Sequence, residues 1–364
     1  MKLSEFDYVL PKELIAQYPV KQREKCRLMV LDRASRMISH KHFEDIVGYF
    51  NEGDLLVLND TKVIPARLFG KRKTGGKVEL FLLEKKNPVC EALVRPSGRL
   101  KEGERIALES GDEVEVLDRG EIGRRVRFSR PLDEILKASG HIPLPPYIDR
   151  MDEESDRDDY QTAYAVNEGA TASPTAGLHF TRELMERVNQ KMMKSLDSFC
   201  SSESRDEIFC RKFQGSRVKY ITLHTNYGTF APIKTDDIES HNMHKEYFDL
   251  PIDTAKAVVE TKKVGGKIFA VGTTTTRVLE YCAPQNITYN LQLSAKTGHT
   301  DMFIYPGYNF KVVDHLITNF HLPKSTLMLL VSAFAGRDFI MKAYREAIEK
   351  KYRFFSYGDS MIIL

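Results

Sequence analysis

The sequence is poor in cysteine and has no long apolar run. Its 364 residues include five cysteines, which are scattered and form neither a Cys-x-x-Cys pair nor a Cys/His cluster at zinc spacing. We therefore expect free thiols in a reducing compartment. No stretch reaches the roughly 18 apolar residues that cross a membrane. Residues 1–7 lack the apolar core of a signal peptide. These absences predict a cytoplasmic protein without a membrane anchor or a metal centre.

A strong excess of either charge is also missing. Lys and Arg total 54 against 51 Asp and Glu, which gives a net charge of +3, and 42% of residues are hydrophobic. This balance excludes a strongly cationic nucleic-acid coat and long disorder, but it allows an RNA enzyme with a local basic surface. Two basic clusters occur, at residues 67–77 and 119–130. Each fits either a solvated rim of β-hairpins or a set of phosphate contacts, and charge alone does not decide between them.

The pattern of predicted secondary structure changes twice along the chain. Between Gly70 and Arg130, short strand-like runs are separated by Gly and Pro, which predicts a small antiparallel β-barrel or sandwich. The rest alternates strands and helices, which predicts an α/β domain with parallel strands. A buried strand at residues 54–58 precedes the β module, so the module is an insertion. We predict a large α/β domain, barrel-like or layered, from residues 1–69 and 145–364, and a small antiparallel β-barrel domain from residues 70–144.

The expected elements follow from periodicity and from turn residues. Residues 354–355 are expected in the last core strand, and residues 192–215 form a surface excursion between a helix and a strand. The expected strands outside the module are 54–58, 218–223, 267–271, 301–305 and 313–318; those inside it are 77–83, 90–94, 105–108, 113–117 and 124–128; the expected helices are 181–194, 253–263, 275–282, 325–335 and 338–350.

Residues 173–181 form the first loop whose side chains could bind a ligand or take part in a reaction. Its small residues let a ligand approach the backbone, while Thr175 and His179 add a hydroxyl and an imidazole. The helix that begins at Thr181 favours an anion beside its N-terminus. The alternative is a buried, hydrogen-bonded core histidine at position 179.

A second loop runs from a strand through Gly272 and four threonines to Arg277. It forms a polar cradle that suits a carboxylate or a phosphate. It lacks the second glycine and the Lys-Ser/Thr ending of a phosphate-binding Walker loop, and it is not a dinucleotide turn. The alternative is a capped helix with Arg277 on its surface.

Two further segments add histidines and aromatic residues. His224 closes a strand, and His241 and His244 follow it in a His-x-x-His pair that lacks the helix motif and the acidic partners of a zinc site. Proton transfer or substrate hydrogen bonding is the better interpretation there. The segments 318–326 and 352–359 contribute Asn319, His321 and Asp359, with aromatics that could stack on a base or fill a core.

These same segments carry a family resemblance. The residues 173–181, 272–277, 301–307, 318–325 and 352–359, with the opening 6–11 and the stretch 58–67, resemble the S-adenosylmethionine:tRNA ribosyltransferase-isomerase family of queuosine biosynthesis. The match runs in order from end to end. The chain departs from the family pattern in a longer segment between residues 181 and 218, in Ser173, and in the pair Asn226-Tyr227. Tyr227 could narrow the substrate pocket.

The resemblance implies the fold predicted above and a specific reaction. The family moves the ribosyl part of S-adenosylmethionine onto the aminomethyl group of 7-aminomethyl-7-deazaguanine at the wobble position of tRNA. The products are epoxyqueuosine-tRNA, adenine and methionine. S-adenosylmethionine is a co-substrate, and no metal or redox cofactor is implied. A base must remove a proton next to the sulfonium before adenine leaves and the amine attacks the sugar.

The site residues are assigned to three roles, and we expect a monomer that binds S-adenosylmethionine and tRNA. Two rival functions compete, an S-adenosylmethionine-dependent RNA methyltransferase and a non-catalytic RNA-binding protein. The assigned residues are His179, His321 and Asp359 for catalysis; Thr175, Thr273, Thr274, Thr275, Thr276, Arg277 and Asn319 for substrate binding; and Asn59, Arg67, Arg72 and Lys73 for RNA.

Overall fold

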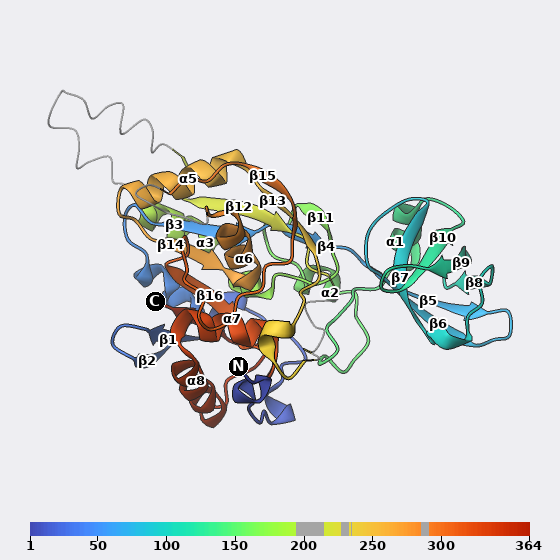
Figure 1. Cartoon of the computed structure of the whole chain (residues 1–364), viewed down its shortest axis with the longest axis horizontal. Helices are drawn as coiled ribbons and strands as arrows, with labels where there is room; N and C mark the ends of the chain where they lie inside the picture. Colours follow the sequence, from blue (N-terminus) through green and yellow to red (C-terminus); the bar gives the residue numbers. More distant parts are fainter. Residues whose placement is uncertain (194–214, 227–232, 234, 285–290) are drawn as a thin grey trace.

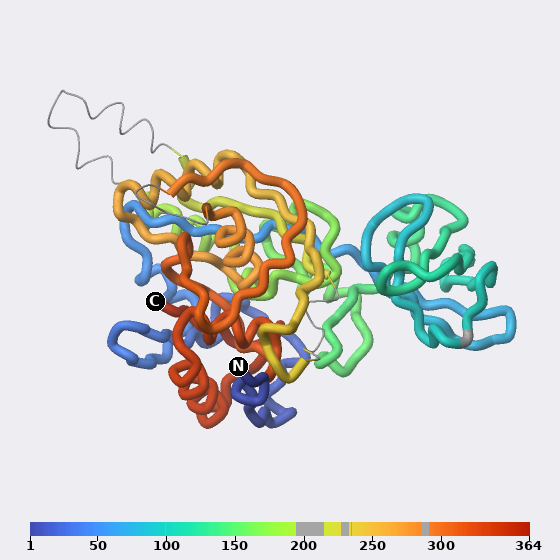
Figure 2. Tube along the Cα trace, in the orientation of Figure 1, coloured from blue at the N-terminus to red at the C-terminus, as the bar shows by residue number. Residues whose placement is uncertain are grey.

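A computed structural model describes residues 1–193, 215–226, 233, 235–284 and 291–364. It shows a large α/β body from which a small β-barrel projects, with both termini in the body (Figure 1). The chain enters and leaves the barrel through two neighbouring segments (Figure 2). These segments are joined by a backbone bridge, in which Arg67 and His141 exchange hydrogen bonds of 3.2 and 2.8 Å.

A nine-stranded sheet forms the centre of the body, in the order β15-β13-β12-β3-β14-β16-β17-β1-β2. The four central strands, β12, β3, β14 and β16, are parallel, as predicted, whereas β13, β15, β17 and β2 pair with a neighbour in antiparallel fashion. The bounds are β1 Arg27–Asp32, β2 Met37–His42, β3 Leu55–Asn59, β12 Val218–Leu223, β13 Glu246–Leu250, β14 Ile268–Val271, β15 Lys296–Thr300, β16 His315–Asn319 and β17 Ser360–Ile363.

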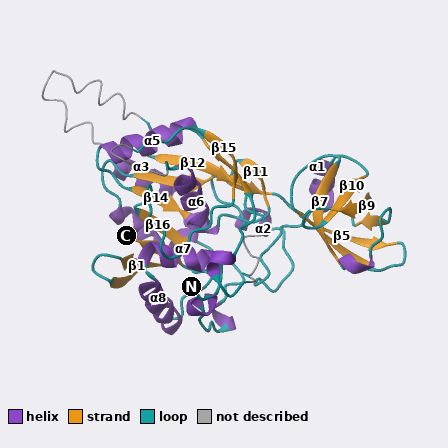
Figure 3. Ribbon diagram, in the orientation of Figure 1, coloured by secondary structure: helices purple, strands orange, loops and turns teal. Residues whose placement is uncertain are grey.

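Two hydrophobic cores lie on opposite faces of this sheet. Side chains alternate along β3, so Leu55 and Val57 join one core while Leu56 and Leu58 join the other. Helices therefore flank the sheet on both sides (Figure 3), and the body is layered and not a closed barrel. The first core packs against α5 Ile252–Lys263, α6 Gly272–Cys282, α7 Thr326–Ala335 and α8 Arg337–Glu349, and the second against α3 Arg182–Met192.

The small domain is a closed antiparallel barrel in the order β10-β7-β6-β5-β8-β9, which confirms the predicted fold class. Its strands alternate buried and exposed residues around a separate core, and α1 closes it with Leu132, Ile135 and Leu136. The first barrel strand, β5, begins at Arg67 and crosses the predicted boundary at 69/70. The domain boundaries at 69/70 and 144/145 stay a prediction. The bounds are β5 Arg67–Arg72, β6 Lys77–Leu82, β7 Val89–Arg95, β8 Arg105–Leu108, β9 Glu113–Arg119, β10 Arg124–Phe128 and α1 Leu132–Ser139.

A few expected elements differ from the structure. The strand predicted at 301–305 is wrong. The observed strand, β15, lies just before it at Lys296–Thr300, and its polar sequence has no hydrophobic periodicity that could have indicated it. Residues 354–355 are buried but precede the last strand, β17. Helix α6 begins at Gly272, three residues earlier than expected. Most of the predicted excursion at 192–215 lies outside the described residues. The remaining elements are β4 Thr61–Val63, paired with β11 Asn167–Ala170, and α2 Asp156–Asp159.

Candidate functional site

The carboxyl ends of β14 and β16 open into one cavity of about 680 Å³, counted out to its mouth. Ligands of open α/β sheets bind at this edge. The loops predicted from residues 173–181, 270–277 and 318–326 all reach it. Its lining residues are Tyr147, Ala172, Ser173, Pro174, Thr175, Ala176, Thr225, Gly272, Thr273, Thr274, Thr318, Asn319, Phe320, His321, Leu322, Ser325, Leu327, Phe355 and Ser356.

The start of α6 supplies hydroxyl and amide groups to the cavity. Gly272 has a φ of +86°, which lets β14 turn directly into the helix. Thr273 and Thr274 then line the cavity. The hydroxyls of Thr275 and Thr276 instead donate to carbonyls one turn back, Val271 at 2.7 Å and Gly272 at 3.1 Å. Two of the four predicted threonines therefore line the cavity, and the hydroxyls of the other two bond to their own helix.

Arg277 is buried in an ion pair. Its side chain is 4% exposed, its guanidinium pairs with Glu246, and Nε donates to the Met302 carbonyl at 2.9 Å. The alternative of a surface arginine is therefore wrong. Arg277 does not line the cavity within the described chain. Because Glu246 neutralises its charge, the geometry does not place this guanidinium on a ligand carboxylate.

His321 lines the cavity just beyond β16. Its Nε2 atom lies 2.9 Å from Thr318 Oγ1, and its backbone N–H donates to the Tyr344 hydroxyl at 2.9 Å. Burial lowers the pKa of His321 to about 3. The ring is therefore neutral at pH 7 and is held in one orientation next to the ligand space.

His179 lies one layer behind the cavity. Its Nε2 atom hydrogen-bonds to Asn319 Oδ1 at 3.0 Å, and its Nδ1 atom lies 3.1 Å from the Cys26 sulfur. Asn319 lines the cavity, and its amide donates to the Phe355 carbonyl at 3.0 Å. Burial lowers the pKa of His179 to about 4 and raises that of the Cys26 thiol. His179 is thus a buried, hydrogen-bonded histidine, and it contacts the site through Asn319.

Asp359 ties the start of β17 to its neighbours. Its carboxylate accepts the backbone N–H groups of Arg27 at 2.9 Å and Arg353 at 2.8 Å, and it forms an ion pair with the Arg27 side chain at 3.1 Å. Only 3% of the side chain is exposed, and it is not among the described residues that line the cavity. The arrangement is that of a structural carboxylate.

The predicted RNA contacts have different environments. Asn59 is 1% exposed and bonds to Leu223 and Thr274, so its side chain is not at the surface, and its contact with RNA stays a prediction. Arg67 pairs with Glu79 at 3.2 Å, and Arg72 pairs with Glu104 at 2.6 Å. Lys73 is exposed. Burial of Asn59 and pairing of Arg72 could not be inferred from the basic cluster alone.

The histidines considered for zinc do not come together. His224 Nδ1 lies 2.8 Å from Thr61 Oγ1, and its ring stacks on Tyr247 at 5.2 Å. His241 packs edge-on against Phe303 at 5.2 Å. In the described part of the chain, no group of three or more His, Cys, Asp or Glu side chains is placed to hold a metal ion. Tyr227 lies outside the described residues.

Two cavity residues, Tyr147 and Ser325, were not among the predicted site residues. Tyr147 comes from the proline-rich exit of the barrel, and its hydroxyl hydrogen-bonds to Ser356 Oγ at 2.6 Å. Its ring packs on Phe355 at 4.7 Å. Ser325 caps α7 and also lines the cavity. The Pro-Pro-Tyr run at 145–147 is the signal that could have suggested a rigidly placed aromatic side chain.

The layered sheet, the projecting barrel and the hydroxyl-rich cavity at the strand ends define an α/β protein built around a small-molecule site. The chain belongs to the queuosine biosynthesis protein family, whose model matches residues 3–197 and 209–363. It is similar to the S-adenosylmethionine:tRNA ribosyltransferase-isomerases of Sulfurihydrogenibium sp., at 49% identity, and of Trichlorobacter lovleyi, at 47%, each over 100% of both chains.

A solved structure agrees with this membership. The crystal structure of S-adenosylmethionine tRNA ribosyltransferase from Thermotoga maritima is 36% identical, with 99% of this chain and 100% of that chain covered and a TM-score of 0.53. Among the described residues, no helix is both long and apolar enough to span a bilayer.

Proposed function

We propose that the chain is an S-adenosylmethionine:tRNA ribosyltransferase-isomerase. It transfers and isomerises the ribosyl moiety of S-adenosylmethionine onto the 7-aminomethyl group of 7-aminomethyl-7-deazaguanine at the tRNA wobble position. Epoxyqueuosine-tRNA forms, and adenine and methionine are released. The observation that carries the proposal is the meeting of the motifs 173–181, 272–277 and 318–325 at one cavity, in a chain of this family.

The cavity suits S-adenosylmethionine electrostatically. No Lys, Arg, Asp or Glu side chain is among its described lining residues, so no cation repels the sulfonium. The first turn of α6 presents backbone N–H groups beside the hydroxyls of Thr273 and Thr274, which is a favourable place for the methionine carboxylate. Thr175 adds a hydroxyl from the opposite loop. The Tyr147 and Phe355 rings offer a surface on which adenine can pack.

The first proton transfer is assigned to His321. A base must remove the proton next to the sulfonium, whose positive charge stabilises the resulting carbanion. His321 is neutral, lines the cavity and hydrogen-bonds to Thr318 through Nε2, so we assign its Nδ1 atom, in the tautomer that carries the hydrogen on Nε2, as the acceptor of this proton. We assign to Asn319 Oδ1, which His179 positions, a hydrogen bond from a ribosyl hydroxyl, since the amide nitrogen already donates to the Phe355 and Ser356 carbonyls. Asn59 supports the same region by donating to Thr274 at 3.3 Å.

The activity is tested with purified protein, S-adenosylmethionine and tRNA that carries 7-aminomethyl-7-deazaguanine. Nucleoside mass spectrometry should show epoxyqueuosine, with one adenine and one methionine per modified tRNA. S-adenosylhomocysteine would indicate a methyltransferase instead. RNA binding without consumption of S-adenosylmethionine would indicate a non-catalytic RNA-binding protein. Either result would refute the proposal.

Matched variants test the cavity as the site. Thr273→Val removes a hydroxyl that lines the cavity, whereas Thr276→Val removes one that bonds to its own helix. We expect KM for S-adenosylmethionine to rise about tenfold in the first variant only, the effect of one hydrogen bond to a charged group. His321→Asn should lower kcat by about 10²–10⁴, as expected for loss of one proton-transfer group.

The remaining assignments are also proposals. We propose a cytoplasmic location, where tRNA and S-adenosylmethionine are found, and a monomeric state without a further cofactor. Light scattering of the purified protein at micromolar concentration should give the mass of one chain, 41.7 kDa. Activity that survives treatment with a chelator would agree with catalysis without a metal.

A further inference from the structure

The basic residues of the barrel separate into two groups. Those on the β9–β10 side are ion-paired: Arg125 with Asp118 at 2.7 Å, Arg127 with Glu115 at 3.2 Å, and Arg130 with Asp112 at 2.6 Å. Each of these charges is balanced locally. Three of the five arginines in the basic cluster at residues 119–130 are therefore neutralised by a neighbouring carboxylate.

Lys71, Lys77 and Arg95 form the second group. They are exposed and make no ion pair with any described residue, and they line a cavity of about 1370 Å³ on the outer face of β5 and β6, counted out to its mouth. Lys71 and Lys77 stand opposite each other in the β5–β6 ladder. Like charges in register, with Cβ atoms about 5 Å apart, destabilise a sheet. An anion between the two ammonium groups would remove that cost.

The acidic residues of this cavity are already engaged. Glu79 pairs with Arg67 at 3.2 Å, and Glu109 lies 3.2 Å from His141 Nε2. The cavity therefore keeps a positive balance. Phe69 and the 58% exposed Met151 add apolar surface next to the cations. Cations beside an aromatic and an apolar side chain suit a nucleic-acid strand, which offers phosphates and base faces together.

This cavity leads toward the candidate active site. A second cavity shares Glu79 and Arg95 with it and extends to residues 143–146 and Thr171. The next residues in the chain, Tyr147 and Ala172, line the active-site cavity. Three cavities thus follow one another from the barrel face to the ends of the body's strands.

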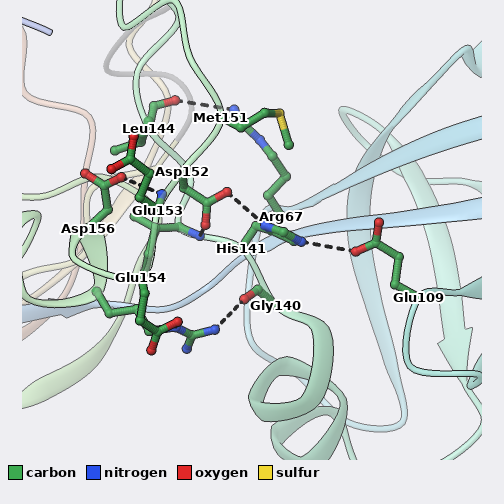
Figure 4. Close-up of polar contacts among 12 residues, drawn as sticks. Arg67, Glu109, Gly140, His141, Leu144, Met151, Asp152, Glu153, Glu154 and Asp156 are labelled. Carbon is green, nitrogen blue, oxygen red and sulfur yellow. Dashed lines mark hydrogen bonds and ion pairs between the residues drawn. The ribbon is translucent and has the colours of Figure 1, made fainter.

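The junction between barrel and body is held by polar contacts. Figure 4 shows His141 between Asp152 and Glu109, at 2.8 and 3.2 Å. Arg157 donates to the Gly140 carbonyl at 3.0 Å, and Arg67 donates to the Leu144 carbonyl at 3.3 Å. These contacts join the two ends of the insertion to the linker, so the barrel face keeps its direction toward the active site.

We propose that Phe69, Lys71, Lys77, Arg95 and Met151, here named the barrel track, bind the backbone of the single-stranded anticodon loop. Lys71 and Lys77 contact one phosphate together, and Arg95 contacts a phosphate nearer the body. The track then guides the wobble base, turned out of its stack, past residues 143–146 into the active site. This inference rests on the proposed function, because it takes tRNA as the substrate.

The test compares two double variants that remove the same charge. Lys71→Ala/Lys77→Ala removes the unpaired cations, and Arg125→Ala/Arg127→Ala removes paired ones. Binding of a fluorescent anticodon stem-loop is measured by anisotropy from 50 to 300 mM KCl. We expect the lysine variant to bind on the order of tenfold more weakly at 50 mM and to lose about 0.7 from the slope of log Kd against log salt, the value for the one phosphate that the two lysines share. The arginine variant should stay within twofold of the wild type.

Steady-state kinetics separate this inference from the proposed function. We expect the lysine variant to raise KM for tRNA while kcat and KM for S-adenosylmethionine stay at wild-type values. Equal binding losses in the two double variants, or an unchanged salt slope in the lysine variant, would overturn the barrel track while the wild type still made product. A wild type that binds RNA but makes no product would refute the function and leave the track intact.

Two controls keep the result interpretable. Lys71→Gln/Lys77→Gln removes the charges but keeps polar side chains only slightly shorter than lysine, and its thermal midpoint should match the wild type, so that a folding defect is recognised. Poly-glutamate of the same total charge should compete poorly with the stem-loop. If poly-glutamate displaced the RNA at the same charge concentration, the track would be a general anion surface and the assignment to nucleic acid would be wrong.

Discussion

At the scale of single residues, His179 acts on the cavity through a neighbour. We predict that His179→Ala lowers kcat by about 10²-fold, because Asn319 loses the partner that fixes its amide, and small misplacements of positioning groups have effects of this size. His179→Gln, which can still donate to Asn319, should recover much of the activity. Because burial lowers the pKa of His179 to about 4, the pH profile of kcat between pH 6 and 8 should keep its shape in both variants. A changed profile would show that His179 itself transfers protons.

Asp359 is predicted to contribute to the stability of the fold and not to catalysis. Asp359→Asn keeps the shape but removes the charge that holds Arg27 and two backbone N–H groups, so we predict a loss of about 1–3 kcal/mol in the free energy of unfolding. The kcat of the folded enzyme should remain within a few-fold of wild type. Asp338→Asn, at a 90% exposed side chain, serves as the control. Urea titration gives the free energy of unfolding of each variant, and initial rates give its kcat. A loss of kcat above 10²-fold without a loss of stability would return Asp359 to the catalytic group.

At the scale of elements, two helix caps differ in what lies beside them. Thr181 caps α3 by accepting from the Leu184 N–H at 3.1 Å, and Ser325 caps α7 by accepting from the Met328 N–H at 3.2 Å. Alanine at either position should cost about 1 kcal/mol of stability. Only Ser325 lines the cavity, so only Ser325→Ala should also raise KM for S-adenosylmethionine. Equal values of KM in the two variants would show that the start of α7 does not contact the ligand.

The barrel strands and the central strands of the sheet were predictable, whereas the polar edge strand β15 was not. The barrel strands alternate because one face meets a closed core, and β3 and β14 are apolar because helices cover both faces of the sheet. The edge strand β15, with the sequence Lys-Thr-Gly-His-Thr, carries no such pattern. The strands β1, β2, β13 and β17 were missed as well, although β1 and β17 are apolar. Strand order within the sheet depends on contacts between distant segments, which local periodicity does not record.

The candidate site was predictable at the level of loops, but the orientation of side chains was not. Thr273 and Thr276 are chemically alike, yet one faces the cavity and the other bonds to its own helix. Arg277 is neutralised by Glu246, which lies 31 residues away in the chain and comes from another strand. A motif marks where ligand-binding groups gather, and only packing decides which of them reach the ligand.

At the scale of the whole molecule, three neutral histidines make stability depend on pH, of which His179 and His321 are buried and His315 is half-buried. Burial lowers the pKa of His179 and His315 to about 4 and that of His321 to about 3, against 6.5 for an ordinary histidine. Below pH 6.5 these histidines therefore bind protons in the unfolded chain but stay unprotonated in the folded chain. The stabilisation is complete above pH 6.5 and is lost as the pH falls toward 4. Each histidine contributes a slope of about 1.4 kcal/mol per pH unit within that window.

His315 allows this slope to be measured without touching the active site, since it begins β16 at the opposite end from the cavity. We predict that His315→Asn lowers the slope of the free energy of unfolding against pH, between pH 4.5 and 6. The decrease should be about 1.4 kcal/mol per pH unit, the contribution of one histidine. His299→Asn, which changes an exposed histidine, should leave the slope as in the wild type. Urea unfolding followed by circular dichroism at several pH values gives the slopes, because the chain has no tryptophan to report by fluorescence. An unchanged slope in His315→Asn would mean that this imidazole is protonated in the folded state, and acid sensitivity would then have to come from the two histidines around the cavity.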